Sequence, residues 1–182
     1  GVAYTTICNS KRSLKAIFYM AIQDDYLRKN PFDFQINEVI NDDTEPKVPL
    51  TPAQEKELLK FIQDDTIYSK YYDEVVILLE TGLRISELCG LTPADLNFEK
   101  RFIHVDHQLL RSTEDGYYIE TPKTDSGFRQ VPMSAAAYEA FQRVLKNRRG
   151  GKAIQVDGYS NFLFLNRDGL PKVAVHYDAM FK

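Results

Sequence analysis

The sequence has no long hydrophobic run, only two cysteines and no excess of positive charge. A transmembrane helix needs about 20 mainly apolar residues, and a secretory leader needs a basic segment followed by an apolar one. Neither pattern occurs, so we expect a cytoplasmic protein without a membrane span. Cys8 and Cys89 suggest neither a metal site nor a disulfide framework, and we expect both to be buried free thiols. The net charge of −3 argues against nucleic-acid binding over the whole surface, so a DNA-binding surface would have to be a local patch.

The first 50 residues predict a helix followed by a linker. Apolar residues between 6 and 26 recur at helical spacing, and three basic residues lie mostly outside the apolar face: Lys11, Arg12 and Lys15. An exposed basic face is usually only solvated, but it could also contact DNA phosphates. Because a lone helix cannot bury its own apolar face, we expect residues 1–36 to be the end of a helical domain. Residues 37–50 carry one basic and four acidic side chains and have the composition of a flexible linker.

Residues 51–182 predict an α+β domain that is mainly helical and contains a small antiparallel sheet. Thr51-Pro52-Ala53-Gln54 is typical of a helix start, with an N-cap, a proline at the first position and a capping-box glutamine. Strands are expected at 102–106, 117–122 and 128–132, the last two forming a β-hairpin with Lys123 at its tip. Ser134 is expected to cap a further helix, and another helix is expected to begin near Val173.

The segment Thr81-Gly82-Leu83-Arg84-Ile85-Ser86-Glu87-Leu88 is the most informative part of the chain. The apolar spacing predicts a buried helix over 71–80, and Gly82 suits its left-handed C-terminal end. A second helix begins almost at once, which places Arg84 in or beside its first turn. The helix dipole favours anions there, so a guanidinium together with free backbone N–H groups could bind a phosphate. The structural alternative is an Arg84–Glu87 ion pair one turn apart, which contributes roughly a few tenths of a kcal/mol.

These features occur in an order that resembles the tyrosine recombinases, the phage-integrase family, and in particular the integrases of conjugative transposons. The residues that carry the resemblance are Asn30-Pro31-Phe32, Leu50-Thr51-Pro52, Thr81 to Leu88, Leu91 with Asp95, Lys123-Thr124 through Ser126, Arg129 and Val131-Pro132. Each motif alone is weakly specific, but the ordered set spans nearly the whole chain. The resemblance implies that residues 1–36 end a helical core-binding domain and that residues 51–182 belong to the catalytic domain.

The chemistry implied by this resemblance is transesterification at DNA phosphates, without a cofactor or a metal. A tyrosine attacks the scissile phosphate, forms a 3′-phosphotyrosyl link and releases a 5′-hydroxyl end. Arg84 matches the family arginine that stabilises charge on the non-bridging oxygens, and Lys123 matches the hairpin lysine that protonates the leaving oxygen. Glu87 is expected to orient Arg84, whereas Arg129 is expected either to contact phosphate or to be structural.

The expected partners are double-stranded DNA and, in the full-length protein, three further copies in a homotetramer on paired recombination sites. The basic residues of the first helix, Lys11, Arg12 and Lys15, would contribute DNA contacts.

Two family features are missing from residues 1–182: the His/Arg motif, expected after the helix near Val173, and the nucleophilic tyrosine that follows it. We therefore expect this chain to stop before both and to be inactive in cleavage. Tyr177, beside His176, comes too early in the family order and is expected to pack in a helix. His104 and His107 would point to opposite faces of a strand, so we expect no metal site there.

Two alternative functions use the same features. A tyrosine-class topoisomerase would nick and reseal one strand with the same cations, and strand exchange at paired specific sites would distinguish a recombinase from it. A non-catalytic DNA-binding regulator derived from the family would lack the missing motif and the tyrosine altogether.

Overall fold

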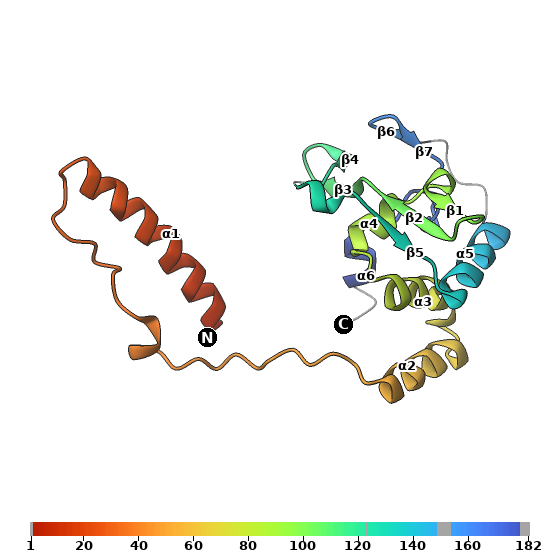
Figure 1. The fold of residues 1–182 in the computed structure, drawn as a ribbon, viewed down its shortest axis with the longest axis horizontal. Helices are drawn as coiled ribbons and strands as arrows, with labels where there is room; N and C mark the ends of the chain where they lie inside the picture. Colours follow the sequence, from red (N-terminus) through yellow and green to blue (C-terminus); the bar gives the residue numbers. More distant parts are fainter. Residues whose placement is uncertain (1, 123, 149–153, 179–182) are drawn as a thin grey trace. The chain divides into compact units, whose positions relative to one another are not determined.

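The computed structural model describes residues 2–122, 124–148 and 154–178. The chain divides into two compact units, Gly1–Leu50 and Thr51–Lys182 (Figure 1). Within the described residues, no helix is both long and apolar enough to cross a membrane.

The N-terminal unit consists of helix α1 (Tyr4–Gln23), a return segment and the 3-10 turn η1 (Ile36–Glu38). The predicted helix exists, but it begins and ends slightly earlier than expected. The return segment is held by Asn30, which is only 3% exposed. The Asn30 side-chain amide donates to the Lys15 carbonyl oxygen at 2.9 Å, and its side-chain oxygen accepts from the Phe32 amide at 3.0 Å. The Phe18 and Phe32 rings then pack with centroids 5.1 Å apart, so Asn30-Pro31-Phe32 folds the chain back onto α1.

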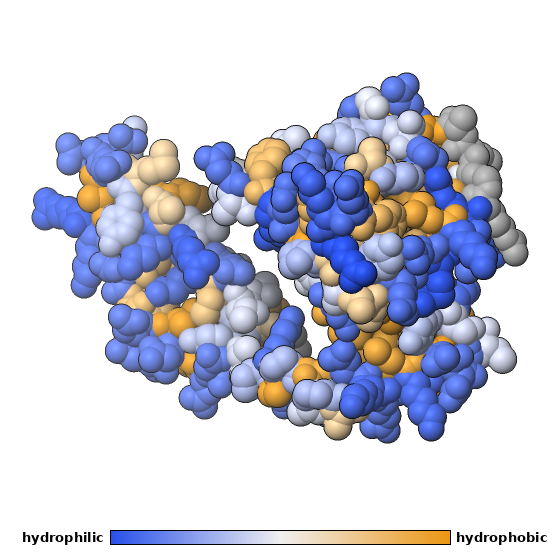
Figure 2. Space-filling model, turned by 45° about the vertical axis from the view of Figure 1, so that its right-hand side comes forward, coloured by the Kyte–Doolittle hydropathy of each residue, from blue (hydrophilic) through white to orange (hydrophobic). Residues whose placement is uncertain are grey.

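Helix α1 leaves much of its apolar face uncovered. No residue of α1 is buried, and Ile17 and Met20 are about 60% exposed. Apolar surface accordingly interrupts the hydrophilic surface of this unit in Figure 2. This agrees with the expectation that the helix cannot bury its own apolar face.

The second unit begins with helices whose ends follow the predicted signals. Helix α2 (Pro52–Asp64) starts at a capping box, in which the Gln54 amide donates to Thr51 Oγ1 and the Thr51 amide donates to Gln54 Oε1. Helix α3 (Tyr72–Thr81) follows the 3-10 turn η2 (Ser69–Tyr71) and ends at Gly82, whose φ of 62° is left-handed as predicted. The other helices in the described part of this unit are α4 (Ile85–Gly90), η3 (Pro93–Asp95), η4 (Asp125–Gly127), α5 (Ala135–Asn147, capped by Ser134) and α6 (Ala174–Asp178).

The described strands of the second unit form three small antiparallel sheets. The first has the order β1-β2-β5, from Leu96–Asn97, Phe102–Val105 and Arg129–Pro132. The second pairs β3 (Gln108–Ser112) with β4 (Gly116–Glu120), and the third pairs β6 (Gln155–Val156) with β7 (Tyr159–Ser160). The mixed helical and antiparallel fold class is as predicted.

The predicted hairpin with Lys123 at its tip is wrong as a strand pairing. Strand β4 pairs with β3, and β5 pairs with β2, so residues 121–128 connect two different sheets. The reason is local: Ser112 and Gly116 are register partners across a short turn, and Gly116 supplies a φ of 73°. Closing this short turn costs less chain entropy than pairing β4 across the longer loop to β5. Strand β3 was not anticipated.

One hydrophobic core holds the second unit together. Helices α3 and α5 pack on each other beside the first sheet (Figure 1), and α4 packs on β3 and α6. The largest fully buried side chains are those of Tyr177, Phe141, Phe162, Ile77, Leu88, Ile103 and Leu109. Because these side chains come from the first two sheets and from helices α3, α4, α5 and α6, the core beneath α4 fixes where that helix starts.

Candidate functional site

Arg84 is the N-cap residue of α4 and projects into solvent. Its side chain is 70% exposed, and Nη1 donates to Glu87 Oε1 at 2.8 Å. The Arg84 amide, expected to be free for an anion, instead donates to Glu87 Oε2 at 2.8 Å. Glu87 thus holds both the backbone and one side-chain nitrogen of Arg84. The rest of the exposed guanidinium faces solvent and can donate hydrogen bonds to an oxyanion.

Arg129 meets the same carboxylate from the start of β5. Its Nη1 donates to Glu87 Oε1 at 2.9 Å and its Nη2 donates to Oε2 at 2.7 Å, a bidentate arrangement. The Glu87 side chain is only 5% exposed, whereas that of Arg129 is 30% exposed. Arg129 thus makes a structural contact, and its contact with phosphate stays a prediction. Two guanidinium groups on one carboxylate leave a local excess of one positive charge.

The pKa of Glu87 is lowered by this arrangement. Burial by itself pushes the pKa of this carboxyl up, but the hydrogen bonds from Arg129 and from the Arg84 amide and side chain outweigh burial. The pKa of Arg129 is raised, mainly by its hydrogen bond to Glu87. Both shifts favour the charged forms of Glu87 and Arg129.

Lys123 lies outside the described residues, so its position relative to Arg84 is untested. The residues that flank it are described and form a tight turn. A Cβ atom placed on Gly127 would lie 2.2 Å from Pro122 Cβ, so the two ends of the turn touch and only glycine fits. Thr124 Oγ1 and Ser126 Oγ lie 3.0 Å apart within it.

Two basic residues of α1, Lys11 and Lys15, contact the return segment of their own unit. Lys15 Nζ lies 2.6 Å from Asp33 Oδ1, and this hydrogen bond raises the pKa of Lys15. Lys11 donates to the Phe34 carbonyl oxygen and lies over the Phe34 ring. Arg12 is exposed and bonds Asn9 Oδ1 at 3.1 Å. Their predicted role in DNA contact stays a prediction.

The predicted placement of the two histidines on opposite faces of one strand is wrong, because His107 lies beyond the end of β2 and both rings approach the Asp106 carboxylate. His104 is exposed, whereas His107 is buried and clusters with Asp95 and Asp106. His107 Nδ1 faces Asp106 Oδ1 at 2.5 Å, and Nε2 faces the Gly90 carbonyl oxygen at 2.9 Å. Both ring nitrogens therefore already have hydrogen-bond partners within the protein.

Tyr177 has the surroundings of a packing residue. Its ring is fully buried in the core, and burial is the main cause that raises the pKa of its hydroxyl far above the ordinary tyrosine value. Lys172 Nζ donates to the neighbouring Glu74 Oε1 at 2.5 Å and lies 5.5 Å from the Tyr177 ring centroid. Of the two thiols, Cys89 is buried as expected, but Cys8 is half-buried.

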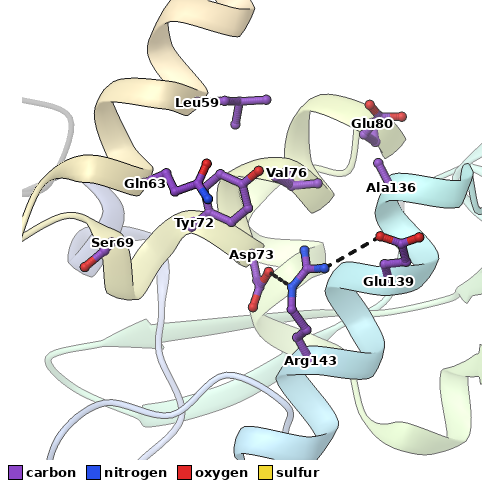
Figure 3. Close-up of a pocket in the computed structure, with 10 residues that line it drawn as sticks. All are labelled: Leu59, Gln63, Ser69, Tyr72, Asp73, Val76, Glu80, Ala136, Glu139 and Arg143. Carbon is purple, nitrogen blue, oxygen red and sulfur yellow. Dashed lines mark hydrogen bonds and ion pairs between the residues drawn. The ribbon is translucent and has the colours of Figure 1, made fainter.

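A separate cavity of about 530 Å³ lies between α2, η2, α3 and α5 (Figure 3). Its lining includes the carboxylates of Asp73, Glu80 and Glu139. The one arginine of the lining, Arg143, points between two of them and donates from Nε to Asp73 Oδ1 at 2.8 Å. An acidic lining repels phosphate, so this cavity does not suit a DNA backbone.

Sequence reasoning missed a polar chain beside Arg84. Ser86 Oγ donates to Gln108 Oε1 at 2.7 Å, and Gln108 Nε2 donates to Glu120 Oε2 at 2.7 Å. No local motif marks these residues, because they come from three separate elements.

The comparisons with known proteins agree with the earlier resemblance. A model of the phage integrase family matches residues 49–182. The transposase from transposon Tn916 of Enterococcus faecalis is 64% identical over 182 residues, which are 100% of this chain and 45% of that protein. The ICEBs1 integrase of Bacillus subtilis (strain 168) is 25% identical over 152 residues, which cover 79% of this chain and 38% of that protein. The chain thus spans less than half the length of these curated relatives.

Solved structures give the same result. The Tn1549 transposon integrase in complex with a circular intermediate DNA matches with a TM-score of 0.96 and 64% identity, covering 100% of this chain and 57% of that one. The XerA recombinase shares the fold, with a TM-score of 0.51 and 22% identity over 75% of this chain and 42% of that one. On the family match, the identity to the Tn916 transposase and the Tn1549 structure, the chain belongs to the phage integrase family of tyrosine recombinases.

Proposed function

We propose that this chain is part of a site-specific DNA integrase of a mobile element, which cleaves and rejoins duplex DNA through a 3′-phosphotyrosyl intermediate. The observation that carries the proposal is the exposed guanidinium of Arg84, held on the buried carboxylate of Glu87 with Arg129 behind it. The similarity to an integrase solved on DNA supports the same partner here.

In the proposed reaction, Arg84 donates to the non-bridging oxygens of the scissile phosphate. The charge on these oxygens grows as a tyrosine oxygen attacks phosphorus, so the contact strengthens towards the transition state. Glu87 and Arg129 keep the Arg84 fork in one orientation, which avoids reorganisation during the reaction. Lys123 is proposed to give its proton to the leaving 5′-oxygen.

The attacking tyrosine is proposed to lie outside residues 1–182. The buried ring of Tyr177 supports this, because a nucleophile must reach the phosphate. We further propose that the full-length protein acts on paired sites as a homotetramer in the cytoplasm, with Lys11, Arg12 and Lys15 contributing to DNA contact.

The test compares variants of the full-length protein in single-turnover cleavage of its own recombination site. Arg84→Lys keeps the charge but loses the planar fork, so cleavage should slow by about 100-fold or more while the DNA dissociation constant changes by less than about threefold. Arg167→Lys, at an exposed arginine, is the matched control. Equal losses in binding and cleavage for Arg84→Lys would refute the catalytic role of Arg84.

A second arm addresses the nucleophile. Residues 1–182 alone, incubated with a suicide DNA substrate and run on a denaturing gel, should form no covalent adduct. An adduct with this chain, lost in Tyr177→Phe, would assign the nucleophile to Tyr177 instead.

A further inference from the structure

The first turn of α4, which carries Arg84 at its N-cap, is tied to two different sheets. Glu87 accepts hydrogen bonds from Arg129 on β5 of the first sheet, at 2.9 and 2.7 Å. The preceding residue, Ser86, donates from Oγ to Gln108 Oε1 on β3 of the second sheet, at 2.7 Å. Because the two ties leave from consecutive residues towards different sheets, together they limit how far this turn can rotate or slide.

The Gln108 amide is itself held in one orientation. Its Nε2 donates to Oε2 of Glu120, its register partner on β4, at 2.7 Å. Because an ionised carboxylate can only accept, the amide nitrogen faces Glu120, and the amide oxygen is left for the Ser86 hydroxyl. All three side chains are half-buried, so water competes less for these bonds than at an open surface. Ser86 therefore meets an acceptor whose orientation is already fixed.

The strand start that supplies Gln108 also holds the other end of α4. The neighbouring His107 meets the Gly90 carbonyl oxygen through Nε2 at 2.9 Å. Gly90 permits this approach, because a Cβ atom there would lie 3.1 Å from the His107 ring and from the Leu109 amide. A helix of six residues is not stable alone, so contacts with neighbouring elements decide where its first turn lies.

We infer that Gln108 is a positioning residue for DNA cleavage, which acts through Ser86 to fix the place of the Arg84 guanidinium. The inference rests on the proposed function, because it assumes that Arg84 binds the scissile phosphate. The Arg84 side chain is 70% exposed and bonds to Glu87 in the same helical turn. Its reach towards a phosphate is therefore only as well defined as that turn, and a displacement of about 1 Å can slow a reaction by about 100-fold.

The experiment measures single-turnover cleavage by the full-length protein on its own recombination site, at saturating protein. Ser86→Ala removes the hydroxyl that reaches Gln108 but supplies a better helix former, so α4 should still form. This variant should cleave about 10-fold more slowly than wild type, while the DNA dissociation constant changes by less than about threefold and the unfolding midpoint stays close to that of wild type. Ser86→Thr keeps a hydroxyl and should cleave at nearly the wild-type rate.

A second variant removes the other partner of the same bond. Gln108→Met should also slow cleavage by about 10-fold, with Gln130→Met, at an exposed glutamine of β5, as the matched control. Because both changes break one bond, the double variant Ser86→Ala with Gln108→Met should cleave no more slowly than the slower of the two single variants. The Ser86 variants keep the test decisive if Gln108→Met folds poorly.

Hydrogen exchange gives a readout that needs no DNA. The Leu88 amide donates to the Arg84 carbonyl oxygen at 2.9 Å, so it reports on opening of the first turn of α4. It should exchange several-fold faster in Ser86→Ala than in wild type or in Ser86→Thr. An unchanged exchange rate would overturn the inference, and so would faster exchange without slower cleavage.

The kinetic results separate the inference from the proposed function. A wild-type cleavage rate in Ser86→Ala, an equal loss in Ser86→Ala and Ser86→Thr, or losses that multiply in the double variant would each overturn the inference. Wild-type protein that binds its site without cleaving it would instead count against the proposed function itself.

Discussion

Arg129 and Glu87, 42 residues apart in sequence, form a bidentate ion pair with nitrogen–oxygen distances of 2.9 and 2.7 Å. This pair joins the start of β5 to the first turn of α4. Since Glu87 also holds Arg84, the position of one exposed guanidinium depends on a strand far along the chain. The Glu87 carboxylate therefore both links β5 to α4 and holds the arginine that is proposed to bind the phosphate.

The variant Glu87→Gln should destabilise the second unit by about 2 kcal/mol at pH 7. The change removes the negative charge of a carboxylate that accepts hydrogen bonds from four nitrogen donors of two arginines, and bonds to a charged acceptor are stronger than neutral ones. Urea unfolding followed by circular dichroism measures the loss, with Glu99→Gln at an exposed glutamate as control.

The difference in free energy of unfolding between wild type and Glu87→Gln should depend on pH. The pKa of Glu87 is lowered in the folded state, so its stabilisation is complete above the ordinary glutamate pKa of about 4.3 and is lost as the pH falls through the lowered value. The difference in unfolding free energy between wild type and Glu87→Gln should be constant above about pH 5 and shrink below about pH 4. A difference that grows on acidification would contradict the ion-pair account.

The variant Gly127→Ala should destabilise the turn that carries Lys123. The added Cβ atom would overlap Pro122, which is part of a rigid ring, so backbone must shift at a cost of about 1–3 kcal/mol. Unfolding measurements on Gly127→Ala, Pro122→Gly and the double variant test this, because Pro122→Gly removes the atom that clashes. Additive losses in the double variant would show that the contact is not the cause.

Cys89 should be unreactive in the folded protein, whereas Cys8 should react. Burial raises the pKa of Cys89 to about 12, so almost no thiolate forms at pH 8, and the sulfur is also inaccessible. Titration with a thiol-specific disulfide reagent should give one fast thiol per native chain and two in denaturant. Cys8→Ser should abolish the fast reaction, and Cys89→Ala should leave it unchanged.

Removing one charge of the Glu74–Lys172 pair should lower the free energy of unfolding more than removing both charges. The two side chains are about 10% exposed, so Lys172→Met leaves a buried carboxylate without its cation and should destabilise the fold by about 3–5 kcal/mol. Adding Glu74→Gln to Lys172→Met should recover part of that loss. Lys100→Met, at an exposed lysine, controls for the loss of charge, and equal stability of single and double variants would contradict the prediction.

The helix boundaries could be predicted because they depend on neighbours a few residues apart. The Thr51–Gln54 capping box and the left-handed Gly82 are both local, and both are confirmed. The segment around Arg84 could be singled out for the same reason. The ordered motifs also indicated the family, which the comparisons confirm.

Only the tertiary structure decided which distant groups meet. Strand β4 could pair with β3 or with β5, and the shorter turn to β3 prevailed because its closure costs less entropy. The contact of Arg129 with Glu87 could not be predicted, because it exists only once the core has brought β5 against α4. Tyr177 was expected to pack in a helix, but the core that fully buries its ring is formed by elements far apart in the sequence. Helix caps and turns depend on residues that are close in the sequence, so they can be predicted from it. Contacts between residues tens of positions apart form only when the shared core has formed.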